Sequence, residues 1–303
     1  MAGISRRVML GSVLANSILD SSFAAVAPEK TVRLTHVDGR RTDYRILMPA
    51  RAQHLGMVVF SHGLKSSNKA YDRILQPWAI AGFLVAAPNH LDSDPSNTVS
   101  RTFIWETRIA DVRLAIEKRA AFQTVAQNSG QELYWPGVCA AGHSFGGATA
   151  QALAGGYLGE NEDQSDRAVS CVIAFSPPGP RPGFIGENAW STVQVPALLE
   201  TGTADILPGF DDWRLHKQGF ENGSHHNRWL VVGAGVDHYF GGLICKLSND
   251  LEAQTQSPAL HATVHITVEF LGAYLKACKP ALAALASAAA AGSFSPAITL
   301  TRV

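Results

Sequence analysis

The sequence predicts an α/β fold: a mostly parallel, twisted sheet that begins with an antiparallel hairpin and carries helices on both faces. Three observations predict it, namely a hairpin turn signal near the start, a series of short apolar runs, and helix-length segments between these runs. Short apolar runs are typical of strands buried on both faces, as in parallel sheets. The 303 residues, 46% of them hydrophobic, are ample for a sizeable core.

The first elements follow in chain order. Residues 31–36 and 42–47 flank Asp38-Gly39, a pair that favours a two-stranded antiparallel hairpin. The expected core strands are the apolar runs at residues 56–60, 83–87, 137–141, 169–175, 197–201 and 228–232. Between the second and third runs, apolar residues from Trp105 to Ile116 recur at steps of four, three and four, which predicts a helix with one apolar face.

The last elements are less regular. Apolar residues from Val264 to Leu275 indicate a final packed helix, which Lys279-Pro280 is expected to end. Residues 280–303 are expected to form an Ala/Ser-rich tail outside the core, because 281–291 are strongly biased in composition. Residues 28–279 contain no linker and no repeat of solenoid length, so they predict a single domain.

The first residues have the features of an export signal. Ser5-Arg6-Arg7 precedes a modestly apolar run, and small residues up to Ala24 offer a cleavage site. Residues 1–24 therefore predict a twin-arginine-like signal and a periplasmic or secreted protein. The alternative is a frayed or amphipathic N-terminal helix, because Asn16 and Asp20 interrupt the apolar run. No later segment reaches the roughly 18 to 20 apolar residues that cross a bilayer, so no stable membrane insertion is expected.

The charge balance of the chain limits which binding partners are expected. Lys plus Arg and Asp plus Glu number 25 each, so no nucleic acid or anionic membrane surface is expected, and a small, roughly neutral substrate fits this balance. The sequence leaves the oligomeric state open.

Export would permit disulfides, and the expectation is a Cys245–Cys278 bond, since Cys139 and Cys171 lie within apolar runs. Four free thiols are the alternative.

A serine bracketed by glycines lies where an apolar run passes into a helix-like segment, at Gly142-His143-Ser144-Phe145-Gly146. In such a strand-to-helix turn the serine hydroxyl is exposed at the sheet edge, and the glycines let neighbouring backbone approach without Cβ clashes. The N–H groups that open the helix can stabilise an anionic intermediate. The pattern predicts Ser144 as a nucleophile, with a non-catalytic Gly-rich helix entry as the alternative.

A serine nucleophile needs a base and a carboxylate that orients it, and in this topology they follow the serine in the order carboxylate, histidine. Asp205 and His238 each come just after an apolar run, at the strand ends where catalytic groups of open α/β sheets gather. The rival carboxylates are Asp211, Asp212 and Asp237. The first two lie further into a helix-like segment, and the third adjoins the histidine in sequence.

The segment Phe60-Ser61-His62-Gly63-Leu64 supplies the donors that a developing oxyanion requires. We expect the backbone N–H groups of Leu64 and Phe145 to form the oxyanion hole, with an ordinary glycine turn as the alternative. Three further residues are candidates for substrate binding: His143, Phe184 and Trp190. The last two lie in or just after the proline-rich residues 176–185, for which a stiff surface loop is an equal alternative.

No metal or cofactor is expected. His261 and His265 are four residues apart on a helix, but no third ligand lies nearby, so they are expected to flank its apolar stripe. Asp92 and Asp94 are expected to form a polar turn rather than a calcium site.

Together these residues resemble the serine α/β-hydrolases, and within them the branch of platelet-activating-factor acetylhydrolase-like esterases and predicted dienelactone hydrolases. The resemblance is carried by residues 59–63, 142–149, 175–179, 201–205 and 237–242, in family order. It implies the α/β-hydrolase fold and cleavage of a small-molecule or polymeric carboxylic ester through an acyl-enzyme. Dienelactone hydrolases proper look like cysteine enzymes, whereas this chain has a serine, so the lactone activity does not carry over.

The resemblance leaves the acyl and alcohol groups open, because the branch spans lipid, lactone and polyester cleavage. Two other functions remain as alternatives. One is cofactor-free lyase or oxygenase chemistry on the same fold. The other is a non-catalytic binding protein, whose usual mark would be the loss of a triad member.

Overall fold

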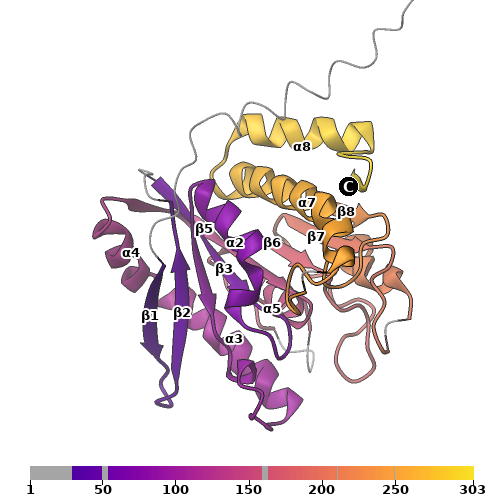
Figure 1. Cartoon of the computed structure of the whole chain (residues 1–303). Helices are drawn as coiled ribbons and strands as arrows, with labels where there is room; N and C mark the ends of the chain where they lie inside the picture. Colours follow the sequence, from indigo (N-terminus) through magenta and orange to yellow (C-terminus); the bar gives the residue numbers. More distant parts are fainter. Residues whose placement is uncertain (1–28, 50–53, 159–162, 210, 249) are drawn as a thin grey trace, which may run out of the picture.

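The computed structural model describes residues 29–303 apart from 50–53, 159–162, 210 and 249. The described part contains one nine-stranded sheet, with the strand order β1-β2-β4-β3-β5-β6-β7-β8-β9 (Figure 1). Its strands are β1 (Lys30–Thr35), β2 (Arg41–Leu47), β3 (His54–Ser61), β4 (Phe83–Pro88), β5 (Glu132–His143), β6 (Val169–Phe175), β7 (Ala197–Gly202), β8 (Arg228–Gly233) and β9 (Ile298–Arg302).

Strands β4, β3, β5, β6, β7 and β8 run parallel to their neighbours, while the hairpin β1–β2 is antiparallel and β2 pairs antiparallel with β4. The predicted fold class is therefore confirmed, including the antiparallel start and each predicted core strand. The register follows the alternation of side chains along each strand. In β3, Met57 and Val59 join the core cluster on one face of the sheet, and Val58 and Phe60 join the cluster on the other.

Helices cover both faces of the sheet. The main ones are α2 (Asp72–Ile80), α3 (Arg101–Glu117), α4 (Arg119–Gln127), α5 (Phe145–Leu153), α6 (Gln218–Glu221), α7 (Leu251–Leu275) and α8 (Lys279–Ala291), with short 3₁₀ turns η1 (Asn68–Tyr71), η2 (Leu91–Ser93) and η3 (Trp213–Lys217). Apolar residues of α3, α4 and α5 share one core cluster, and those of α2 and α7 share the other. Because both faces are covered, the central strands have no polar side and appear in the sequence as mostly apolar runs.

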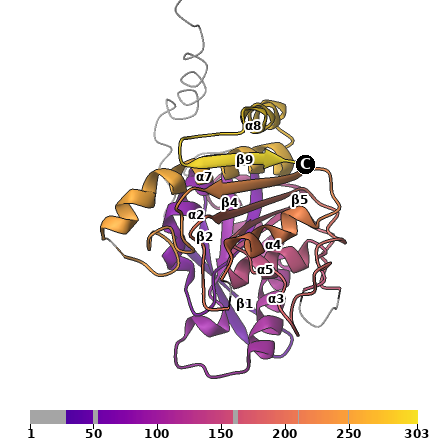
Figure 2. The ribbon, with the colours of Figure 1, turned by 90° about the vertical axis from the view of Figure 1, so that its right-hand side faces the viewer.

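The expectation that residues 280–303 lie outside the core is wrong. Lys279-Pro280 does not end the chain's helical part but begins α8, where proline near the first helical position costs no backbone hydrogen bond. Figure 1 shows α8 lying along α7, and Figure 2 shows β9 beneath α8. β9 pairs antiparallel with β8, and its Ile298 and Leu300 are buried. The biased composition reflects close packing, since Ala281 lies against Gly272 of α7.

The expected Cys245–Cys278 disulfide is also wrong: all four cysteines of the chain are free thiols. Cys278 is exposed immediately before α8, whereas Cys245 lies beside Gly63 at the carboxyl end of the sheet. Cys139 and Cys171 face one another across the β5–β6 pair, deep in the core.

The sequence also predicted an export signal and the absence of a membrane span. The predicted signal, residues 1–24, lies outside the described residues. Within the described residues, no helix combines the length and the apolar character that crossing a bilayer requires.

Candidate active site

Ser144 occupies a strained turn between β5 and α5. Its backbone has φ 55° and ψ −122°, a region that side-chain-bearing residues rarely adopt. The two glycines make this turn possible, because a Cβ on Gly142 would lie 2.2 Å from the Gly146 carbonyl oxygen, and one on Gly146 would lie 2.0 Å from the Ser61 carbonyl oxygen. Ser144 is half-buried although the residues around it are buried, so the turn raises its hydroxyl out of the core.

Asp205 and His238 meet at the carboxyl ends of two neighbouring strands, β7 and β8. His238 Nδ1 lies 2.7 Å from Asp205 Oδ1, and the Thr201 hydroxyl donates to Asp205 Oδ2 at 2.9 Å. Burial alone would raise the pKa of Asp205, but the hydrogen bond and charge of His238 more than offset this and hold the pKa at about 2. Asp205 therefore remains a carboxylate at neutral pH and keeps Nδ1 of His238 protonated as the donor.

Burial lowers the pKa of His238 below its ordinary value of 6.5, although the hydrogen bond to Asp205 works in the opposite direction. At neutral pH its imidazole is thus uncharged. With Nδ1 committed to Asp205, the other ring nitrogen carries the free lone pair that a general base needs.

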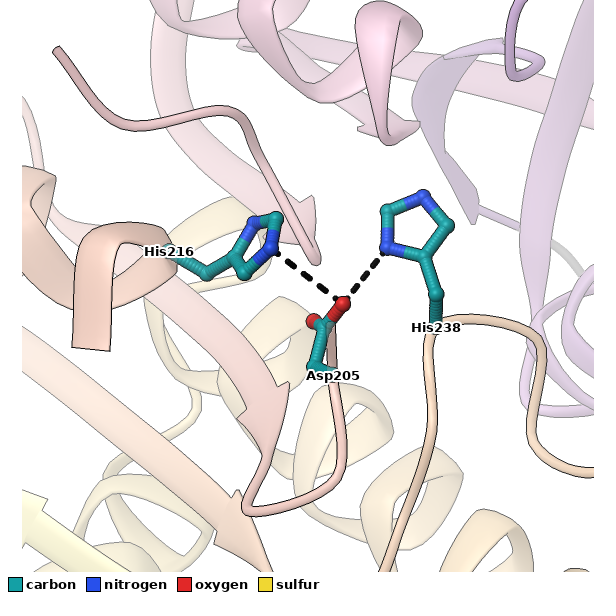
Figure 3. A group of neighbouring side chains, drawn as sticks. All are labelled: Asp205, His216 and His238. Atoms are coloured by element: carbon teal, nitrogen blue, oxygen red, sulfur yellow. Dashed lines mark hydrogen bonds and ion pairs between the residues drawn. The ribbon is translucent and has the colours of Figure 1, made fainter. Parts of the chain in front are cut away.

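A second histidine, His216 of η3, contacts the same carboxylate, as Figure 3 shows. Its Nε2 lies 3.2 Å from Asp205 Oδ1, and its Nδ1 lies 2.8 Å from the Pro177 carbonyl oxygen, which accepts a hydrogen bond. The side chain is buried, and burial is the main cause that lowers its pKa. Sequence reasoning missed His216, because η3 reaches Asp205 only when the chain after β7 folds back.

The loop after β3, which carries Leu64, is held by a buried ion pair. Arg108 of α3 donates Nε to Asp92 Oδ1 at 2.9 Å and Nη2 to Asp92 Oδ2 at 2.8 Å. The same guanidinium donates to the carbonyl oxygens of His62 and Gly63, and Asp92 accepts from the Lys65 N–H at 2.7 Å. Asp92 lies in the short turn η2, as the sequence predicted, but it is buried and anchors this loop.

Behind this loop lies a second array of serine, histidine and aspartate. The Ser61 hydroxyl lies 2.8 Å from His90 Nε2, and His90 Nδ1 lies 2.8 Å from Asp111 Oδ2. All three residues are buried, and none of them lines the cavity that contains Ser144. The array therefore stabilises the end of β3, whose Ser61 carbonyl contacts Gly146 below the nucleophile turn.

Ser144 and His238 open into one cavity of about 570 Å³. Its walls are formed by Leu64, Lys65, Arg101, Thr102, Trp105, Phe145, Pro178, Arg181, Pro182, Gly183, Phe184, Leu207, Pro208, Tyr239, Cys245 and Lys246. The two residues predicted to supply oxyanion donors, Leu64 and Phe145, are among them.

Of the three predicted substrate-binding side chains, only Phe184 reaches the cavity lining. His143 is fully buried, with Nδ1 2.9 Å from the Tyr71 hydroxyl and Nε2 2.8 Å from the His238 carbonyl oxygen, so it supports the His238 loop. Trp190 is also buried, in the core cluster on the α5 face. Proximity in sequence to the nucleophile or to a catalytic-side loop did not reveal which way either side chain points.

Asp205, His216 and His238 are also the one group in the described part of the chain whose His, Cys, Asp or Glu atoms lie close enough to share a metal ion, within 4.8 Å of one another. His238 Nδ1 and Asp205 Oδ1 already face each other at hydrogen-bonding distance. This geometry suits a carboxylate that orients the His238 ring and stabilises its imidazolium form.

Comparisons with known proteins bear on the fold and on the first part of the chain. A family model described as Chlorophyllase matches residues 31–179, which include Ser144 but end before Asp205 and His238. Among solved structures, an esterase of Pyrococcus furiosus is similar with a TM-score of 0.57 and 14% sequence identity, over 82% of this chain and 93% of that chain. No curated protein matches the sequence. At this identity the structural likeness shows the fold.

Proposed function

We propose that this chain is a serine α/β-hydrolase that hydrolyses carboxylic esters through an acyl-enzyme intermediate, with Ser144, His238 and Asp205 as the catalytic triad. The Chlorophyllase model over residues 31–179 and the esterase-like fold support this assignment. The observation that carries the proposal is the strained Ser144, which opens into the same cavity as His238 while His238 is hydrogen-bonded to the buried Asp205. The esterase among the similar structures supports the same reaction class.

Each residue has a defined role in the reaction. The free ring nitrogen of His238 accepts the Ser144 hydroxyl proton as Oγ attacks the ester carbonyl, and the resulting oxyanion accepts hydrogen bonds from the N–H groups of Leu64 and Phe145. His238 then returns the proton to the departing alkoxide. Water repeats the sequence on the acyl-enzyme and releases the acid. Asp205 stays ionised throughout and stabilises the imidazolium, as its pKa of about 2 requires.

A fluorophosphonate probe tests the nucleophile. The proposal expects covalent labelling at Ser144, located by peptide mass spectrometry, and no labelling of Ser144→Ala. Ser191→Ala, which changes an exposed serine remote from the cavity lining, is the matched control and should label normally. Folded protein in which Ser144 stays unlabelled would overturn the proposal. Turnover of p-nitrophenyl esters from acetate to long acyl chains then defines the acyl pocket.

We also propose that residues 1–24 direct export through the twin-arginine route, on the basis of Arg6-Arg7 and the weakly apolar run after them. Expression in a bacterium with a functional twin-arginine translocase should yield periplasmic protein with an N-terminus near residue 25. Arg6→Lys with Arg7→Lys should keep the protein in the cytoplasm. Full-length protein in the cytoplasm of the wild-type strain would contradict this proposal.

A further inference from the structure

The charges around the cavity are all of one sign. Its lining contains four basic residues, Lys65, Arg101, Arg181 and Lys246, and no Asp or Glu among the described residues. The chain as a whole carries 25 basic and 25 acidic residues, so this imbalance is local. The site that holds Ser144 is therefore positive, although the protein is neutral overall.

The four basic residues come from separate parts of the chain. Lys65 follows Leu64 in the loop after β3, and Arg101 is the first residue of α3. Arg181 lies in the loop after β6, and Lys246 lies eight positions after His238. Four segments thus bring a cation to one cavity, which a charge run on a single solvated helix face would not do.

Local carboxylates do not neutralise three of these cations. Among the described residues, Lys65, Arg101 and Lys246 form no ion pair with an Asp or Glu. Two acids close to the site are committed elsewhere, because Asp92 is bound by Arg108 and Asp205 by His238. The Lys246 ammonium lies 4.7 Å from the centre of the Tyr239 ring, which positions it without removing its charge.

Aromatic rings form the apolar part of the same cavity. The Trp105 ring lies edge-on to Phe145 and Phe184, with centroids 5.6 and 5.0 Å apart, and Phe145 stacks on Phe184 at 5.7 Å. All three rings line the cavity into which Ser144 opens, so they form an apolar wall of the proposed substrate site. A flat apolar group would bury most area against such a surface.

On the basis of the proposed ester hydrolysis, we propose that the substrate is an ester with a flat, apolar body and an anionic group, such as a carboxylate. The aromatic rings bind the body and the cations bind the anion. This revises the expectation of a neutral substrate, which the balanced composition suggested. Positive charge at the cavity also steers anionic substrates to the site and raises kcat/KM more than kcat.

Two matched substrate pairs test the proposal. Monomethyl terephthalate and methyl 4-carbamoylbenzoate differ only in a carboxylate or carboxamide on the acyl side, and 3-acetoxybenzoate and 3-acetoxybenzamide differ in the same way on the alcohol side. We expect kcat/KM to favour the carboxylate by about tenfold in at least one pair. The preferred pair identifies the side of the ester that faces the cations, and added NaCl should reduce the preference.

Variants then connect the preference to its residues. Arg101→Gln combined with Lys246→Gln should reduce the carboxylate-to-carboxamide ratio of kcat/KM to about 2 or less. Lys118→Gln removes an exposed lysine that does not line the cavity, and it should leave the ratio unchanged. Circular dichroism and fluorophosphonate labelling of Ser144 confirm that each variant retains its fold and its nucleophile.

The outcomes separate this inference from the proposed function. If Ser144 is labelled and neutral esters are cleaved, but neither pair shows a preference for the carboxylate, the anionic-substrate proposal is overturned and ester hydrolysis stands. The anionic-substrate proposal is likewise overturned if a preference exists but the double variant keeps it. If Ser144 is not labelled in folded protein, both proposals fail together.

Discussion

Replacing Arg108 with methionine removes the cation that holds the loop carrying Leu64. In the folded protein Arg108 and Asp92 are 0% and 2% exposed, and Arg108 donates to Asp92 twice and to the carbonyl oxygens of His62 and Gly63. After the substitution, Asp92 keeps only the Lys65 N–H as a donor and becomes a buried carboxylate without its counter-charge.

The expected cost follows from this burial. Removing one partner of a buried ion pair destabilises proteins by about 3–5 kcal/mol, because the remaining charge stays desolvated. The free energy of unfolding of a typical domain is about 5–15 kcal/mol. Arg108→Met should therefore fold, but it should unfold at a clearly lower urea concentration than the wild type. Displacement of the Leu64 N–H should also reduce kcat by about 10²–10³, the usual effect of losing one oxyanion donor.

Urea unfolding at pH 7 measures the stability change, with Arg113→Met as the matched control. Arg113 lies on the same helix but donates to the Gln164 carbonyl oxygen instead of a carboxylate, so its loss should cost only about 0.5–1.5 kcal/mol. Adding Asp92→Asn to Arg108→Met should recover part of the loss, because a neutral amide replaces the stranded charge. Equal midpoints for Arg108→Met and Arg113→Met would refute the reasoning.

The pH dependence gives a second check on the same pair. Burial raises the pKa of Asp92, but the hydrogen bonds and charge of Arg108 overcome this and hold it at about 2, below its ordinary value of 3.8. Because the folded-state pKa is depressed, this stability is fully present above about pH 4 and is lost as the pH falls toward 2. In Arg108→Met burial raises the pKa of Asp92 without that opposing charge, so the difference in stability between wild type and variant should narrow as the pH falls and continue to narrow from pH 4 toward 2.

Three further predictions concern the triad and the sheet edge. Asp205→Asn should lower kcat by about 10⁴ with little loss of fold, whereas Asp211→Asn, at an exposed rival carboxylate, should keep wild-type kcat; the reverse order would reassign the acid. The kcat/KM profile should rise with pH through a pKa below 6.5 and then level off, because burial lowers the pKa of His238 and only its neutral form accepts a proton; an acid limb centred above pH 7 would contradict this. Ending the chain at Gly292 removes β9 with its buried Ile298 and Leu300 and should cost about 3–6 kcal/mol in urea unfolding, while an unchanged midpoint would show that the edge strand is dispensable.

The sheet was predictable where each strand carries its own local signal. A strand covered on both faces needs apolar side chains at every position, so β3 to β8 appear as apolar runs whatever their neighbours are. β9 lacks this signal because it is an edge strand, Ile298–Arg302, in which buried and exposed residues alternate over only five positions. Its pairing with β8 depends on where α7 and α8 return the chain, and no local pattern contains that information.

The candidate site likewise contains residues that the sequence predicted and residues that it did not. Ser144, Asp205 and His238 were predictable because the topology sends each strand end to one edge of the sheet, and chain order then limits the choices. Arg108, Asp92 and His216 act through contacts with residues of other elements, and no local motif in the sequence indicates those contacts. The predictions of substrate binding for His143 and Trp190 were wrong for a related reason, since sequence position does not determine whether a side chain points to the cavity or into the core.

Net charge is a bulk property that says little about the charge at the cavity. Equal totals of acidic and basic residues suggested a neutral substrate, yet a reacting ester responds only to charges within about one Debye length, roughly 8 Å at physiological ionic strength. Within the cavity lining, the described charges are four cations. Two acids close to the cavity have structural tasks: Asp92 holds the loop that carries Leu64, and Asp205 holds His238. Because those tasks need buried, paired carboxylates, the proposal assigns recognition of the substrate's anion to Lys65, Arg101 and Lys246, which form no ion pair with an Asp or Glu among the described residues.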